Sequence, residues 1–142
     1  MTYVRIKLEQ YKYLCNMNNA IYIATSEANS GKSLVTLGLM RLLLRKVARV
    51  GYFRPIIDSN GNHLNDNHIN TMISYFDLAI NPKDSFALTR QEYIKMRNNG
   101  KQGEIIDLII EKYKALEEKC DFILVEGSDF SGEGTVIELD AN

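Results

Sequence analysis

The sequence predicts an α/β fold, in which helices cover both faces of a mostly parallel β-sheet in three α/β/α layers. Three short runs of apolar and β-branched residues, 20–25, 49–54 and 121–126, have the character of strands buried on both faces. The stretches between them place apolar residues at helical spacing. Because strands that alternate with helices are typical of a parallel sheet, these two observations predict the fold class.

The composition limits the class of protein and its partners. The chain has 142 residues, 45% hydrophobic and 25% charged, as in an ordinary globular protein of about one domain. A net charge of −1, and tyrosines that do not interleave with a basic patch, predict no nucleic-acid partner. The most apolar stretch, 34–44, contains Arg41 and is too short for a bilayer, so we expect no membrane partner. Cys15 and Cys120 form no CxxC pair, which favours reduced thiols in the cytoplasm.

The first predicted elements form a β-α-β unit. Residues 20–25 are a strand, residues 26–31 a loop of small and polar residues, and residues 32–47 a helix. Residues 49–54 are the second strand. We expect this strand to end at Pro55, because proline has no N–H to donate to a sheet ladder.

The later elements follow from periodicity and capping signals. In chain order the sequence predicts a turn at 58–62, a helix from 65 to about 81, a short helix opened by a Thr89–Glu92 capping box and closed at 98–100, and an amphipathic helix at 104–119. The third strand follows at 121–126. It ends on a carboxylate, Glu126, which precedes a glycine.

A phosphate-binding loop is predicted between the first strand and the first helix. Gly31 allows a phosphate to approach the backbone, Lys32 can reach terminal phosphates, and the Ser33 hydroxyl can bind Mg²⁺. The simple GxxxxGK[ST] spacing requires a first glycine where this chain has Ser26. We therefore predict a site for ATP or another nucleoside triphosphate with Mg²⁺, whose nucleotide-binding residues are Glu27, Ala28, Asn29, Ser30, Gly31, Lys32, Ser33 and Arg54.

Three further side chains are predicted to lie near this loop, each with a simpler alternative. Glu126 ends a neighbouring strand, where it can hold Mg²⁺ or be a surface carboxylate. Arg54 can contact phosphate or an acidic partner, or cap its strand in solvent. Asp66 can be a magnesium ligand or an N-cap, and the sequence slightly favours the cap. His63 and His68 lack a matching ligand cluster and are expected to be surface residues.

The chain resembles the P-loop domain at the N-terminus of the long form of bacterial phosphate acetyltransferase. The resemblance is carried by residues 21–33, 51–56 and 122–130 and covers about 18–142. That domain is similar to dethiobiotin synthetase, whose loop also has one extra residue before its Gly-Lys-Thr. The magnesium ligands implied by this likeness are Ser33, Asp66 and Glu126.

Departures from the related families favour the acetyltransferase. Residues 128–130 are Ser-Asp-Phe, as in that family, whereas dethiobiotin synthetase continues with small residues. Arg54 stands where the synthetase has a substrate-binding lysine. ATP-driven partitioning proteins carry a second lysine early in the loop, and Ser26 and Glu27 do not provide one.

The resemblance implies a domain that regulates the enzyme or supports its assembly. Acetyl transfer between coenzyme A and phosphate belongs to a separate domain in that family, so we do not expect this chain to catalyse it alone. The expected partners are nucleotide and the rest of an acetyltransferase chain or another copy. Two alternatives stay open, an ATP-dependent ligase like dethiobiotin synthetase and a structural module that no longer binds nucleotide.

The sequence also suggests how the chain is divided. Residues 1–19 read as an appendage, and 20–142 as a P-loop domain that is incomplete at its C-terminal end, because the family continues into another helix and further strands. An open sheet edge would then need a covering partner.

Overall fold

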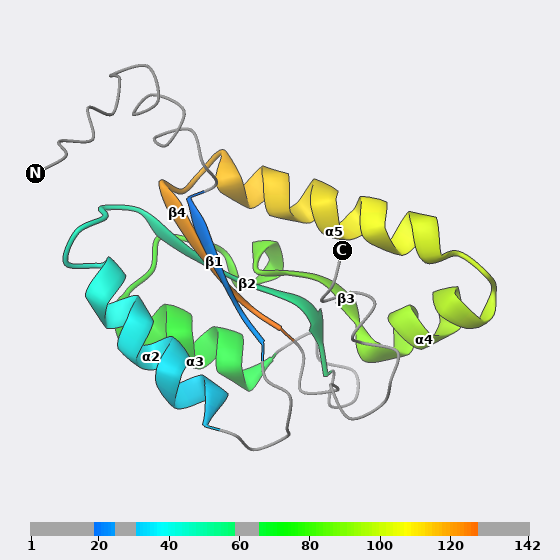
Figure 1. Cartoon of the computed structure of the whole chain (residues 1–142), viewed down its shortest axis with the longest axis horizontal. Helices are drawn as coiled ribbons and strands as arrows, with labels where there is room; N and C mark the ends of the chain where they lie inside the picture. Colours follow the sequence, from blue (N-terminus) through cyan, green and yellow to red (C-terminus); the bar gives the residue numbers. More distant parts are fainter. Residues whose placement is uncertain (1–18, 25–30, 59–65, 128–142) are drawn as a thin grey trace, which may run out of the picture.

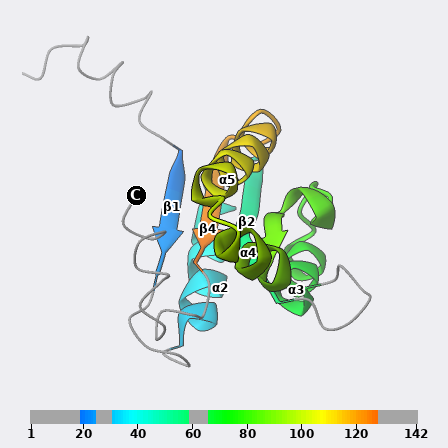
Figure 2. The same cartoon turned by 90° about the vertical axis from the view of Figure 1, so that its right-hand side faces the viewer.

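The computed structural model describes residues 19–24, 31–58 and 66–127, and within them it contains one four-stranded parallel sheet (Figure 1). The strand order is β1-β4-β2-β3, and Figure 2 shows the strands side by side in this order. The strands are β1 (Ala20–Ile23), β4 (Phe122–Glu126), β2 (Val50–Ile57) and β3 (Phe86–Thr89). All three strand pairs are parallel, so the predicted α/β class is confirmed.

Helices lie on both faces of this sheet (Figure 1). On one face are α2 (Lys32–Leu43) and α3 (Asn67–Phe76), which pack with β2 and β4 around Met40, Tyr52 and Leu124. On the other is α5 (Gln102–Glu117), preceded in the chain by α4 (Arg90–Asn98). A short 3₁₀ turn, η1 (Pro82–Asp84), precedes β3.

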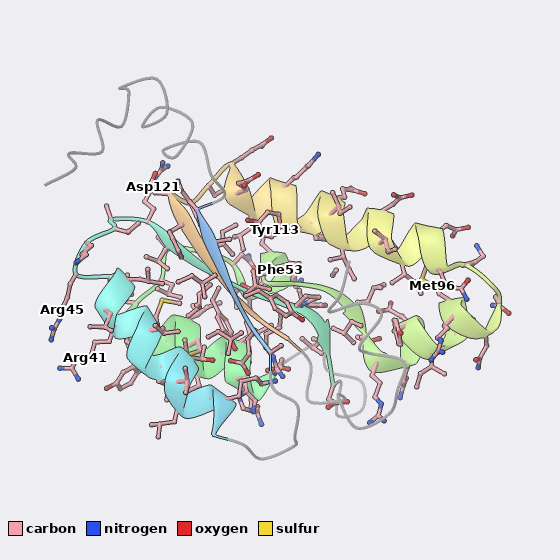
Figure 3. The ribbon with its side chains drawn as sticks, in the orientation of Figure 1. Arg41, Arg45, Phe53, Met96, Tyr113 and Asp121 are labelled. Atoms are coloured by element: carbon pink, nitrogen blue, oxygen red, sulfur yellow. The ribbon has the colours of Figure 1, made fainter. Side chains whose placement is uncertain are left out.

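The alternation of side chains along β2 and β4 decides which residues face α2 and α3. Phe53, Ile123 and Val125 pack on the α5 side, where the rings of Phe53 and Tyr113 meet edge to face with centroids 6.0 Å apart (Figure 3). The neighbouring positions on each strand point to the opposite face, because side chains alternate with a period of two. Tyr52 and Glu126 therefore share the α2 and α3 side.

Several expectations about the elements need correction. The first strand is not buried on both faces, because none of the four residues of β1 is buried and Tyr22 is 45% exposed. A fourth strand, β3, was not predicted, because its four residues lead directly into the capping box of α4. The first helix ends at Leu43, and α3 ends at Phe76, where Asp77 adopts a left-handed conformation.

Pro55 does not end the second strand. β2 continues to Ile57 because β3 pairs with its later residues, and the Arg54 N–H donates to the Ser85 carbonyl on that side. In a strand the next N–H points to the opposite neighbour. That neighbour, β4, has ended at Glu126, so the N–H that proline lacks is not needed for the ladder.

Candidate functional site

The candidate site lies where the carboxyl ends of β2 and β4 meet the first turns of α2 and α3. Lys32 and Ser33 open α2, and Glu126 closes β4. Arg54 comes from β2, and Asp66 is the N-cap residue of α3. Open α/β sheets bind ligands in the crevice at this edge.

Gly31 has a backbone conformation that suits the end of the predicted phosphate loop, where the helix begins. It is the N-cap of α2 with φ at 80°, in the left-handed region that glycine adopts without steric cost. Its carbonyl accepts hydrogen bonds from the N–H groups of Leu34 and Val35, at 3.0 and 3.2 Å. Four other residues predicted to bind nucleotide lie outside the described residues, so their roles stay predictions: Glu27, Ala28, Asn29 and Ser30.

Lys32 connects the start of α2 with the end of β4. Its side chain is buried, and Nζ donates a hydrogen bond to the Gly127 carbonyl at 2.5 Å. The Lys32 carbonyl in turn accepts a bond from the Thr36 hydroxyl at 3.0 Å within the helix. The predicted phosphate-binding amine therefore already contacts the strand end that carries Glu126.

Glu126 is a buried carboxylate with two differently placed oxygens. The residue is 1% exposed, which excludes the surface-carboxylate alternative. Oε2 accepts a hydrogen bond from the Tyr52 hydroxyl at 2.8 Å. Oε1 is buried and accepts no hydrogen bond from any described residue, and it lies 3.9 Å from Arg54 Nε. Burial of Tyr52, with the charge of Glu126 beside it, raises the pKa of the phenol far above its ordinary value, so the hydroxyl remains a donor.

Arg54 and Asp66 form a buried ion pair at the start of α3. Nη1 of Arg54 lies 2.7 Å from Oδ2 of Asp66, and both side chains are about 95% buried. Oδ1 of Asp66 accepts from the backbone N–H groups of His68 and Ile69, at 2.8 and 3.1 Å. The predicted N-cap is thus confirmed, and the acidic partner of Arg54 is Asp66 instead of solvent. Both oxygens of Asp66 therefore already accept hydrogen bonds. A role of Asp66 as magnesium ligand stays a prediction.

A cavity of about 280 Å³ lies beside these groups, between α2 and α3. Ser33 and Glu126 both line it, so a residue with a hydroxyl and a residue with a carboxylate border the same cavity. Mg²⁺ prefers such oxygen ligands and keeps several waters, so these two residues fit the ion. The other lining residues are Leu37, Tyr52, Asn67, His68, Thr71 and Met72.

In the parts of the chain that the structure describes, no group of three or more His, Cys, Asp or Glu side chains gathers in a way that could hold a metal ion by those side chains alone. His68 is exposed at the edge of the cavity, as expected of a surface residue, and His63 lies outside the described segments. Within the same segments, no helix is long and apolar enough to cross a membrane.

Two contributors to the site were not found from the sequence. The sequence pattern places Tyr52 only in the second strand, and no motif marks the Gly127 carbonyl as an acceptor for Lys32. A period-two count from Arg54 could have placed Tyr52 on the same face. The register that sets Tyr52 beside Leu124, two residues before Glu126, is visible only in the folded sheet.

Three curated proteins similar to this chain carry the same activity in their names. A family model described as an AAA domain matches residues 19–141. A phosphate acetyltransferase of Nitratidesulfovibrio vulgaris is 42% identical over 126 residues, which are 89% of this chain and 18% of that protein. A phosphate acetyltransferase of Synechocystis shows the same identity and coverage. One from Pseudomonas aeruginosa is 26% identical over 109 residues, 77% of this chain and 15% of that protein. The chain thus spans less than a fifth of the length of these curated relatives.

Proposed function

This chain belongs to the AAA-domain family, and we propose that it is the nucleotide-binding regulatory or assembly domain of a cytoplasmic phosphate acetyltransferase. The ligand is a nucleoside triphosphate with Mg²⁺. One observation carries the proposal: Ser33 at the start of α2 lines one cavity with the buried residue Glu126, and the neighbouring Lys32 contacts Gly127 at the end of the same strand. The acetyl transfer named in the relatives belongs, in this proposal, to another part of such an enzyme.

Each described residue has a distinct role in the proposed complex. Gly31 opens the helix so that its N–H groups face the phosphates, and the Lys32 amine neutralises phosphate oxygens. Ser33 and Glu126 hold Mg²⁺, which supplies positive charge to the phosphates when it is bound. Arg54 is paired with Asp66 and fixes the start of α3 beside the cavity, and its contact with nucleotide stays a prediction.

Lys32 must exchange one acceptor for another when nucleotide binds. Its amine now donates to the Gly127 carbonyl, and a phosphate oxygen would replace that neutral acceptor with a charged one. An anionic phosphate oxygen adds a Coulomb attraction to the lysine ammonium that a neutral carbonyl does not supply. The exchange is therefore favourable, and it links nucleotide binding to the end of β4.

Calorimetry with MgATP on the intact folded protein tests this function. Lys32→Ala should abolish saturable binding, because it removes the phosphate-binding charge. Lys46→Ala is the matched control, since Lys46 is exposed just beyond α2 and should leave binding unchanged. Circular dichroism confirms that each variant is folded. Absence of MgATP binding by the folded wild type would refute the proposal.

A structural module without nucleotide is the second candidate, and one contact favours it. The Lys32–Gly127 hydrogen bond ties α2 to β4 without any ligand, as a purely structural lysine would. In that case Lys32→Ala lowers the free energy of unfolding, while MgATP neither binds to the wild type nor raises its melting temperature. The ligase alternative predicts ADP release with diaminopelargonate and bicarbonate, and no such turnover would exclude it.

A further inference from the structure

We infer that Tyr52 is a positioning residue, whose hydroxyl holds one oxygen of Glu126 so that the other faces the divalent cation of the nucleotide complex. The inference rests on the proposed function, since it assigns a role within the same site. Tyr52 lies within β2 and belongs to none of the sequence motifs described above. The two oxygens of Glu126 have unequal surroundings.

The sheet places Tyr52 directly against the carboxylate. β2 and β4 run parallel with Tyr52 opposite Leu124, so Glu126 lies one side-chain repeat further along the same face. Tyr52 is fully buried, and its hydroxyl meets Oε2 of Glu126 at 2.8 Å. Both side chains also line the cavity that Ser33 borders. Tyr52 thus contacts the carboxylate from the sheet while the cavity lies beside it.

This contact makes the two oxygens of Glu126 chemically different. Oε2 is committed to the phenol, whose hydroxyl donates a hydrogen bond to it at 2.8 Å. Oε1 is buried and accepts no hydrogen bond from the residues that the structure describes. A buried carboxylate oxygen without a donor is costly, so a cation at this oxygen would be stabilised. The fixed Oε2 holds the side chain in the rotamer that leaves Oε1 available.

The neighbouring carboxylate has no comparable oxygen. Oδ1 of Asp66 accepts from two backbone N–H groups, and Oδ2 accepts from Arg54. Rotating Asp66 toward a metal would break the cap of α3 or the ion pair. Glu126 is therefore the carboxylate that is prepared for a metal, and Tyr52 is the group that prepares it.

Tyr52→Phe tests the inference because it removes only the hydroxyl and keeps the ring in the core. Removing an outer partner of a metal ligand typically weakens metal affinity by about 10-fold to 100-fold. We expect a loss of at least about tenfold in Mn²⁺ affinity of the nucleotide-bound protein, measured by electron paramagnetic resonance. The affinity for ATP in the presence of EDTA, measured by calorimetry, should change less than about twofold, because no divalent cation is then bound at Glu126.

Tyr113→Phe is the matched control. Tyr113 lies on α5, on the opposite face of the sheet, so loss of its hydroxyl should leave both measurements unchanged. In Glu126→Gln the metal ligand is lost, and adding Tyr52→Phe to it should cause no further loss of Mn²⁺ affinity. Full additivity of the two changes would show that Tyr52 does not act through Glu126, and would overturn the inference.

The outcomes separate this inference from the proposed function. If the wild type binds ATP only with metal and Tyr52→Phe binds Mn²⁺ equally well, the positioning role is wrong and the function stands. If Tyr52→Phe weakens metal-free and metal-dependent binding equally, Tyr52 is merely structural. If the wild type binds no nucleotide, the proposed function fails. Should Tyr52→Phe not fold, Mn²⁺ broadening of tyrosine ring signals in the nucleotide-bound wild type decides: broadening of Tyr52 no greater than that of Tyr113 contradicts the inference.

Discussion

Replacing Asp66 with asparagine should destabilise the protein strongly although it preserves the shape of the side chain. Asparagine is as good an N-cap as aspartate, so the bonds from the N–H groups of His68 and Ile69 to Oδ1 survive. The charge that pairs with Arg54 is lost, and Arg54 is 5% exposed. Removing one partner of a buried ion pair costs about 3–5 kcal/mol.

The surroundings of Arg54 place the expected loss near the lower end of this range. Glu126 lies 3.9 Å from Arg54 Nε and retains part of the compensating charge. We expect Asp66→Asn to lose about 3 kcal/mol and Asp66→Ala about 1 kcal/mol more, because alanine also removes the cap. A loss of this size is a large share of the roughly 5–15 kcal/mol that stabilises a typical domain.

Urea unfolding followed by circular dichroism measures the loss. Asp121→Asn is the control, because the Arg49–Asp121 pair is of the same type but both side chains are largely exposed, at 60% and 42%. Exposed pairs contribute little to stability, so its midpoint should stay near that of the wild type. Equal midpoints for Asp66→Asn and Asp121→Asn would refute the role assigned to the buried pair.

Two further predictions concern the capping box of α4 and the packing of Gly51 in β2. Thr89→Ala should reduce the free energy of unfolding by about 1 kcal/mol, because the Thr89 hydroxyl accepts a hydrogen bond from the Glu92 N–H at 3.3 Å. Thr89→Ser keeps a hydroxyl and should retain most of the wild-type stability. An unchanged urea midpoint in Thr89→Ala would contradict the role of this cap. Gly51→Ala should cost about 1–3 kcal/mol, because the new Cβ would meet Cys120 Sγ at 2.9 Å. Adding Cys120→Ala removes that sulfur and should recover part of the loss in thermal melts, whereas strict additivity of the two losses would refute the clash.

Local patterns allowed much of the fold to be predicted. The run 122–126 and the amphipathic helix before it appear close to their expected bounds, since a buried strand and a two-faced helix each have a period visible in the sequence. The Thr89–Glu92 capping box is present as predicted, because it depends on residues three apart. β3 was missed because its strand character comes from pairing with β2, which no local pattern announces.

The sequence predicted several residues of the candidate site but not the hydrogen bonds and ion pairs that join them. Lys32, Ser33 and Glu126 were expected together because parallel strands end at one edge. In the structure Ser33 and Glu126 line one cavity, and Lys32 contacts Gly127 beside Glu126. The partners could not be foreseen. Whether Arg54 pairs with Asp66 or with a ligand depends on where α3 begins relative to β2, which is a matter of packing.

The sequence by itself determined the fold class, the loop between the first strand and helix, and the family, because these depend on residue order and short-range spacing. Only the tertiary structure decided that β4 lies between β1 and β2. That arrangement sets Tyr52 against Glu126 and leaves one carboxylate oxygen without a hydrogen bond from the described residues. The physical reason is that hydrogen bonds and ion pairs between distant residues depend on strand order and register, which arise from burying the whole core at once.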